Sequence, residues 1–179
     1  MKSIFCTLCL FVLFQESYSQ LFMTRNGYIG FFSVTPLEDI KAENRQVYAV
    51  VDVAKKNMAF TCLMNGFLFK KELMQEHFNE NYVESDKYPK ASFNGSYFGE
   101  VAMQKNGIYP VKVKGQLTLH GITKEIEVNA NFEVKNNLLR ANSGFKLAPG
   151  DFDIKIPSLV REKIAKQIDV QVLIECNPK

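Results

Sequence analysis

The chain has 179 residues, a length that suits one domain with a sizeable core and leaves too little for two. Its 22 lysines and arginines against 19 acidic residues give a net charge of +3 without a basic block, which argues against nucleic acid as a partner. Fifteen phenylalanines, no tryptophan and only two histidines favour an apolar cavity over acid–base chemistry.

The first residues carry the pattern of an export signal. Lys2 gives a short basic start, residues 4–14 form a nearly unbroken apolar run, and small residues precede a cleavage position before Gln20. The apolar run is too short to anchor the chain across a bilayer. We therefore expect a signal peptide over residues 1–19, one domain over residues 20–179, and a periplasmic or secreted protein that is not an integral membrane protein. An N-terminal core helix is the alternative.

Beyond residue 20 the apolar residues mostly recur at every second position, which is typical of antiparallel strands with one buried face. Turn signals at Asn65-Gly66, Gly121 and Asn136-Asn137 separate the alternating runs. The pattern predicts about eight strands, over residues 28–35, 46–53, 58–64, 67–69, 111–120, 126–134, 138–147 and 168–175.

Two segments break this period and predict short helices, over residues 71–83 and 158–167. Ser158, which follows Pro157, supplies the N-cap of the second one. No linker, low-complexity tract or internal repeat divides the chain. About eight strands, short turns and two short helices predict an all-β fold, in the form of one extended antiparallel barrel. Such a barrel is just wide enough to hold one small ligand or to fill itself with side chains.

The segment 71–83 holds His77, one of the two histidines, among three glutamates. On a helical wheel, at about 100° per residue, His77 lies on the apolar arc, whereas Glu72 and Glu76 lie opposite. We therefore expect His77 to be half-buried, to bond a backbone carbonyl and to act as the polar anchor of a helical lid. Glu72, Glu76 and Glu80 then form a solvated acidic strip, for which binding of a basic partner or a divalent cation is the alternative.

Catalytic and metal-site patterns are weak in this sequence. His77 and Glu80 are three residues apart, but zinc sites need three or four ligands and the HExxH pattern is absent. Neither a Ser-His-Asp nor a Cys-His arrangement is legible, and the sequence has no glycine-rich phosphate loop. We expect neither a metal nor an enzyme, and a lipid-directed activity through His77 and Glu80 is the least favoured hypothesis.

Two of the four cysteines, Cys6 and Cys9, lie in the expected signal peptide, so that Cys62 and Cys176 remain in the exported chain. Both lie on alternating strand patterns. An oxidising compartment permits a disulfide between them, and the sequence leaves open whether their Cα atoms come close enough. Two free, buried thiols are the favoured interpretation.

Two stretches together carry a family resemblance: LMQEHFNENYVESDKYPKASFNG over residues 73–95 and GQLTLHGITKEIEV over residues 115–128. They resemble the YceI-like family of secreted or periplasmic lipid-binding proteins. The first family motif is matched here by His77, Tyr88, Pro89 and Phe93. The second is matched by Gly115, Leu117, Thr118, Gly121, Thr123 and Lys124. The resemblance covers roughly residues 33–175.

The resemblance implies an extended lipocalin-like barrel whose apolar interior holds a long isoprenoid-type chain, such as a polyprenyl or quinone tail. It implies no covalent cofactor and brings no catalytic residues. We therefore expect an exported binding protein for an apolar lipid, serving transport, storage or scavenging. An exported structural or interaction protein with a filled barrel is the alternative, with the acidic strip or the Lys112 and Lys114 face meeting its partner. A homodimer also stays open.

A long apolar ligand needs a dry, deep cavity with few polar groups, and methionine adapts to an irregular chain. The helix over residues 71–83 would cover one opening of the barrel. Plain core packing is the alternative role for each candidate lining residue. The candidates are Phe60, Met64, Phe67, Phe69, Met74, Phe78, Tyr82, Phe93, Phe132, Phe145 and Phe152.

Overall fold

The computed structural model describes residues 21–179, so the expected signal peptide and its cleavage position lie outside the described residues. The described chain is mostly strand. The strands are β1 (Leu21–Val34), β2 (Asp39–Asp52), β3 (Asn57–Leu63), β4 (Leu68–Phe69), β5 (Lys90–Phe98), β6 (Gly107–Leu119), β7 (Ile122–Lys135), β8 (Leu138–Leu147) and β9 (Ile168–Pro178).

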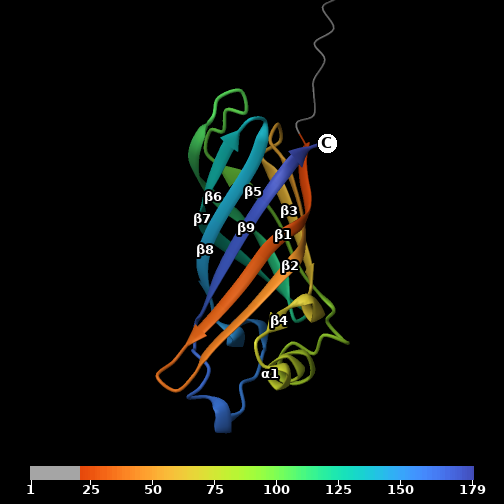
Figure 1. Cartoon of the computed structure of the whole chain (residues 1–179), viewed down its shortest axis with the longest axis vertical. Coiled ribbons are helices and arrows are strands. Elements are labelled where there is room, and N and C mark those ends of the chain that lie inside the picture. The colour runs from red at the N-terminus through yellow and green to blue at the C-terminus, as the bar shows by residue number, and fades with distance from the viewer. Residues whose placement is uncertain (1–20) are drawn as a thin grey trace, which may run out of the picture.

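Eight of these strands close into one elongated antiparallel barrel, as Figure 1 shows. Around the wall they follow the order β1, β9, β8, β7, β6, β5, β3 and β2, and the pairing of β1 with β2 completes the circle. The two-residue strand β4 adds to the free edge of β2. The predicted all-β, lipocalin-like antiparallel barrel is confirmed.

The first two strands are longer than the sequence pattern predicts. Asn26-Gly27 has the composition of a turn, yet β1 runs through it with register shifts between Thr24 and Gly27 and between Gly27 and Ile29. A bulge of this kind bends a strand and tightens its twist without ending it. The chain therefore pairs β1 with β2 from Leu21 to Val34.

Strand β5 was not among the expected strands, although it pairs with both β3 and β6 and is needed to close the barrel. Gly95 on β5 lies opposite Gly115 on β6. A Cβ atom added to either glycine would lie 2.7 Å from Cζ of Phe93. Glycine at both positions lets the two strands and the Phe93 ring approach closely, but the same glycine weakens the alternating strand signal.

Two tight hairpin turns connect β6 to β7 and β7 to β8. His120 and Gly121 have φ angles of 51° and 73°, and Asn136 and Asn137 have φ angles of 51° and 61°. Positive φ at both central residues is the mark of the type I′ turn, whose twist matches that of the flanking strands. The turns predicted at both places are confirmed.

The half of the barrel away from α1 is filled by side chains. The ring of Tyr97 packs against Phe132 with 4.9 Å between centroids, and its hydroxyl donates to the carbonyl of Val53 at 3.3 Å. Phe22 and Leu139 are also almost completely buried in this cluster. This packing closes one end of the barrel and confines any internal space to the other half.

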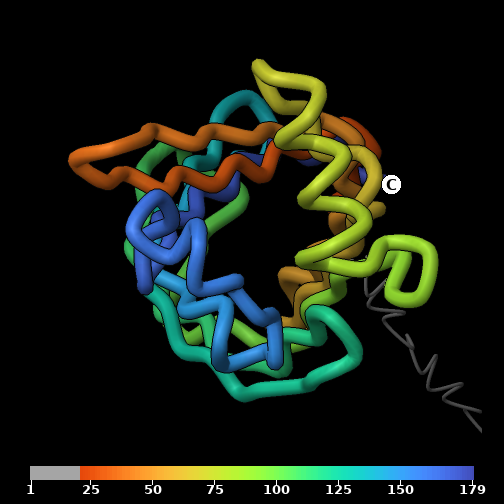
Figure 2. Tube along the Cα trace, turned by 90° about the horizontal axis from the view of Figure 1, so that it is seen from below, coloured from red at the N-terminus to blue at the C-terminus, as the bar shows by residue number. Residues whose placement is uncertain are grey.

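The segment predicted as a helix over residues 71–83 is helical. It consists of α1 (Glu72–His77) and a wider π-helical turn, Phe78–Tyr82, in which the amide of Val83 donates to the carbonyl of Phe78 at 2.9 Å. Seen along the barrel in Figure 2, this segment lies along one side of the rim. In residues 21–179, no helix has the length and apolarity that crossing a membrane requires.

The second predicted helix, over residues 158–167, is wrong. Only the 3-10 turn Ser158–Val160 forms there, and its N-terminal cap has no side-chain hydrogen bond. Most helical stability in proteins comes from burying an apolar face. Leu159, which should have supplied that face, is 92% exposed, so a longer helix would have no surface to pack against.

Candidate functional site

The lower half of the barrel encloses a cavity of about 540 Å³. All eight barrel strands contribute to its wall, because residues of one parity on each strand point inward. The wall is almost entirely aliphatic and aromatic, and charged side chains line the cavity only where α1 and the neighbouring loops meet the barrel. The lumen is therefore hollow in this half and opens at the end that carries α1.

Ten of the eleven candidate lining residues lie on the wall of this cavity, and the exception is Phe152. Phe152 is buried in a cluster beside the cavity, together with Val83 and Ile154. Its role is therefore core packing. Contact of the other ten with a ligand remains a prediction. The residues on the wall are Phe60, Met64, Phe67, Phe69, Met74, Phe78, Tyr82, Phe93, Phe132 and Phe145.

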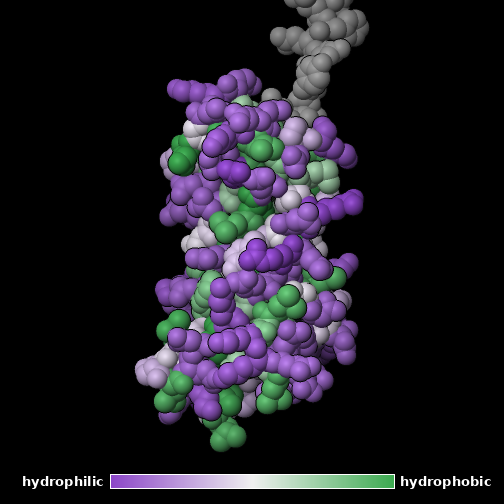
Figure 3. Space-filling model, viewed as in Figure 1, coloured by the Kyte–Doolittle hydropathy of each residue, from purple (hydrophilic) through white to green (hydrophobic). Residues whose placement is uncertain are grey.

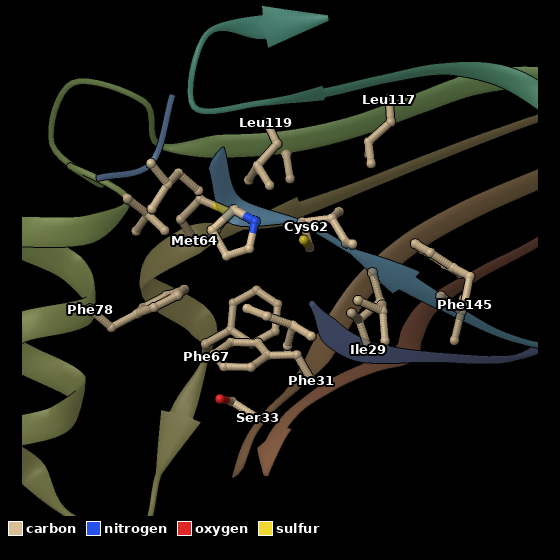
Figure 4. A pocket seen from close by; sticks show the side chains of 18 of the residues that line it. Ile29, Phe31, Ser33, Cys62, Met64, Phe67, Phe78, Leu117, Leu119 and Phe145 are labelled. Atoms are coloured by element: carbon tan, nitrogen blue, oxygen red, sulfur yellow. The ribbon is translucent and has the colours of Figure 1, made fainter. Parts of the chain in front are cut away.

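Phe78 fastens the helical segment to the barrel wall. Its ring lies 5.0 Å from that of Phe69, 5.4 Å from that of Phe31 and 5.7 Å from that of Phe67, centroid to centroid. Figure 4 shows Phe31, Phe67 and Phe78 converging on one side of the cavity. Aromatic pairs at these separations contribute about 0.5–1.5 kcal/mol each beyond the area that they bury. The cluster positions the segment beside the opening.

Several wall residues were missed by the sequence analysis, and most of them are aliphatic. Ile29 and Phe31 come from β1, Leu117 and Leu119 from β6, and Val128 from β7. Four of these are labelled in Figure 4, where they surround the cavity. The alternating pattern already placed them on inward faces. Most of them are neither aromatic residues nor methionine, the residue types on which the prediction of the lining rested.

The polar anchor of the lid is His120, and the prediction that assigned this role to His77 is wrong. Nδ1 of His120 lies 2.9 Å from the carbonyl oxygen of Phe152, which accepts a hydrogen bond from it, and Nε2 lies 2.8 Å from a carboxylate oxygen of Glu84. His77 is exposed, because α1 lies along the rim and its apolar arc faces the open mouth.

The two sequence motifs behind the family resemblance meet at this anchor. The ring of Tyr88 lies 4.5 Å from the ring of His120, centroid to centroid. A Cβ atom on Gly121 would lie 2.6 Å from the Tyr88 ring, so only glycine fits there. The Lys-Tyr-Pro end of the first motif therefore packs on the hairpin turn of the second.

Charged and polar contacts join the segments around the mouth. Nζ of Lys71, at the start of α1, lies 2.7 Å from a carboxylate oxygen of Glu38 in the turn between β1 and β2. This hydrogen bond holds the pKa of Glu38 below its ordinary value, with a smaller contribution from Lys163. The amide of Ala165 donates to Oγ of Ser33 at 2.8 Å, which ties the loop before β9 to β1.

The described residues offer little for covalent or metal chemistry. Across residues 21–179, no group of three or more His, Cys, Asp or Glu side chains is placed to hold a metal ion. Cys62 and Cys176 are free and buried. Burial raises the pKa of Cys62 to about 11 and that of Cys176 to about 12, so both thiols stay protonated at neutral pH. The arrangement is suited to holding an apolar molecule.

Both the sequence and the fold of this chain are similar to those of known proteins. The sequence model of the YceI-like domain matches residues 15–176. A polyisoprenoid binding domain from Saccharophagus degradans shares the fold with a TM-score of 0.76 and 12% identity, over 89% of this chain and 99% of that chain. Burkholderia cenocepacia BcnA gives a TM-score of 0.70 and 14% identity, over 83% of this chain and 95% of that chain.

The YCEI protein of Campylobacter jejuni gives a TM-score of 0.63 and 18% identity, over 79% of this chain and 86% of that chain. At these identities the likeness concerns the fold alone. A comparison with curated proteins found no match. The domain match extends over nearly all of the described chain and includes both motifs that meet at His120. The chain therefore belongs to the YceI-like family.

Proposed function

We propose that this protein is an exported binding protein that holds one apolar lipid, of isoprenoid or quinone type, in the barrel lumen for transport, storage or scavenging. The observation that carries the proposal is the cavity of about 540 Å³, whose wall is almost entirely aliphatic and aromatic. The structural relative described as a polyisoprenoid binding domain supports it. The export pattern of residues 1–19 supports a periplasmic or secreted location.

The cavity volume limits the length of the bound chain. A volume of about 540 Å³ accommodates roughly 18 groups of the size of a water molecule, at about 30 Å³ each. A methylene group has a similar size. One chain of about that many carbons therefore fits inside, and a much longer polyprenyl tail would extend out through the mouth.

The distribution of polar groups sets the orientation of the ligand. Charged side chains reach the cavity only at its mouth, where Glu38, Lys71 and Lys163 lie. Burying apolar surface contributes roughly 25 cal/mol per Å², whereas a buried polar group without a partner opposes binding. The apolar chain therefore enters first, and the head group of an amphipathic lipid remains at the mouth.

The alternative of an interaction protein with a filled barrel needs a lumen packed with side chains. The hollow lower half of the barrel argues against it. The acidic strip of Glu72, Glu76 and Glu80 is exposed, as expected for a solvated face. On the other proposed interaction face, Lys112 and Lys114 pair with glutamates of the neighbouring strand at 2.9 and 3.1 Å.

The test is titration of the purified chain with cis-parinaric acid, a polyene fatty acid whose fluorescence rises in apolar surroundings. Val128→Phe places a ring inside the lumen, because Val128 lines the cavity. Asn129→Phe is the matched control, since Asn129 follows on β7 and is exposed. We expect saturable binding that Val128→Phe weakens at least tenfold and Asn129→Phe leaves unchanged. Absence of binding, or equal loss in both variants, would overturn the proposal.

A further inference from the structure

The rim around the mouth exposes large apolar side chains that the fold does not use. Leu37, in the turn between β1 and β2, is 63% exposed, Leu73 on α1 is 61% exposed and Leu159 is 92% exposed. Leu73 belongs to the cavity lining, and all three leucines lie outside both buried clusters. Figure 3 shows apolar side chains at this lower end of the molecule, with polar side chains between them. Exposed apolar side chains that border the mouth of a cavity are candidates for an interaction surface.

Basic residues accompany these leucines. The loop that carries Leu159, residues 154–167, contains four basic side chains and one acidic side chain, Glu162. All four basic residues are exposed, and they are Lys155, Arg161, Lys163 and Lys166. Lys70 and Lys71 lie directly before α1 on the adjoining segment and are also exposed. The loop of residues 154–167 therefore combines an exposed leucine with an excess of basic side chains, which suits an anionic surface with an apolar interior. The α1 side of the rim differs, because it carries the exposed Glu72, Glu76 and Glu80, and Lys71 is paired with Glu38 there.

The loop of residues 154–167 has one side that borders the cavity and another side that is exposed to solvent. Val160 and Ile164 line the cavity, and the amide of Ala165 is bonded to Ser33, so one side of the loop is part of the mouth. Leu159, next to Val160, points into solvent instead of following its neighbour into the cavity. The same loop thus borders the cavity and presents the most exposed leucine of the described chain.

We infer that this end of the barrel docks on an anionic lipid bilayer through the loop of residues 154–167, with Leu159 inserted among the head groups and the basic side chains of that loop held against the lipid phosphates. Insertion of apolar side chains combined with basic residues is the mode by which proteins bind a membrane interface. Docking in this orientation would let an apolar chain pass between bilayer and cavity without crossing water. That exchange rests on the proposed function. The docking itself rests on the rim alone.

The opposite end of the barrel supplies controls. Ile108, at the start of β6, is 70% exposed, so it matches Leu159 in exposure but lies at the end of the barrel that is closed. Lys105, in the loop before β6, is an exposed lysine at the same end. Substitutions at these two positions report whether any loss of an exposed apolar or basic side chain would change vesicle binding.

The test is vesicle flotation of the full chain, with vesicles of phosphatidylcholine alone and with vesicles containing about 30% phosphatidylglycerol. We expect binding to the anionic vesicles that falls at about 0.5 M salt, where charges are screened. Leu159→Asp should reduce the vesicle affinity about tenfold, and the pair Arg161→Glu and Lys163→Glu should reduce it at least as much. Ile108→Asp and Lys105→Glu should leave it unchanged.

Three results would overturn the inference. These are absence of binding to anionic vesicles, equal binding to both vesicle compositions, and an equal loss caused by the control substitutions. Circular dichroism of each variant verifies that the barrel is folded. The cis-parinaric acid titration of Leu159→Asp separates the two proposals, because a docking variant should keep its lumen and bind the probe as the natural chain does. A chain that docks on vesicles but does not bind the probe would refute the proposed function alone.

Discussion

Nε2 of His120 lies 2.8 Å from a carboxylate oxygen of Glu84, and this contact joins two elements that are 36 residues apart in the sequence. Glu84 follows the helical segment at the mouth, and His120 forms the turn between β6 and β7. The other ring nitrogen of His120 is hydrogen-bonded to the carbonyl of Phe152. One imidazole therefore fixes the end of the helical segment, a hairpin turn and the loop before β9 relative to one another.

This contact predicts strong coupling between the two residues. Glu84→Ala should lower the free energy of unfolding by about 1–3 kcal/mol, because it leaves a buried histidine nitrogen without a partner. His120→Ala should lower it by a similar or larger amount, since the Phe152 carbonyl also loses its donor. Urea denaturation of both variants and of the double variant measures the coupling. Glu80→Ala, an exposed glutamate on the same segment, is the control and should change little.

If the effects of Glu84→Ala and His120→Ala simply add, the contact is not energetically important. Residues that share a hydrogen bond normally show a coupling energy of about 0.5–3 kcal/mol in such a cycle. A value within the error of zero would mean that His120 acts through its packing on Tyr88 alone.

Alanine substitutions at Phe152 and Phe145 should distinguish a residue packed in the core from a residue that lines the cavity. Phe152 is 3% exposed and does not line the cavity, so Phe152→Ala should lower the free energy of unfolding by about 3–5 kcal/mol. Phe145 lines the cavity, where one side of the ring already has no neighbours, so Phe145→Ala should have a smaller effect. Thermal denaturation compares the two. Equal losses of stability would show that Phe145 is packed like a core residue.

The glycine pair between β5 and β6 should tolerate no side chain. A Cβ atom on Gly115 would lie 2.7 Å from the Phe93 ring and would also meet the backbone of β5. Gly115→Ala should therefore destabilise the barrel by about 1–3 kcal/mol through overpacking. Gly144→Ala is the matched control on β8, because its nearest heavy atom would be 3.9 Å away. Chemical denaturation in which the two variants behave alike would refute the close approach of β5 and β6.

The buried thiols predict a fall in stability at alkaline pH. An unfolded thiol has a pKa of about 9.0, whereas the folded pKa of Cys62 is about 11 and that of Cys176 about 12. Between pH 9 and 11 the unfolded chain therefore releases protons that the folded chain retains. Each thiol should lower the free energy of unfolding by up to about 1.4 kcal/mol per pH unit in that range. The variant with Cys62→Ala and Cys176→Ala should show a flatter pH profile in urea denaturation. An unchanged slope would mean that other groups dominate.

The alternating pattern predicted most of the barrel, because a strand with one buried face has an apolar residue at every second position. This period does not depend on which strands lie beside it. The pattern failed at glycines whose role, a bulge or a close approach, depends on the neighbouring strand. Gly27 lies in a bulge within β1, and Gly95 allows close approach to β6, but both have the composition of turns. The extent of β1 and the existence of β5 depend on pairing that local sequence does not reveal.

The candidate site was predicted only in part, because the alternating pattern shows which strand residues face inward but does not show which distant segments meet. Phe60, Phe93, Phe132 and Phe145 line the cavity because inward parity on their strands carries them there, and the aliphatic residues on the same faces were open to the same argument. Met74, Phe78 and Tyr82 reach the cavity from the helical segment. The anchoring histidine was not predictable from its own segment. His77 has the local helical pattern of a buried residue, whereas His120 is buried because Glu84, Tyr88 and Phe152 meet it from other parts of the chain.

The central claim is that the lower half of the lumen holds an apolar chain, and a crystallographic density map of the protein purified with its bound lipid tests it most directly. The account predicts continuous, elongated density inside the cavity, between Phe132 in its depth and Lys71 at its mouth, with any bulkier head group beside Lys71. Density for side chains that fill this space, or for ordered water throughout it, would contradict the account.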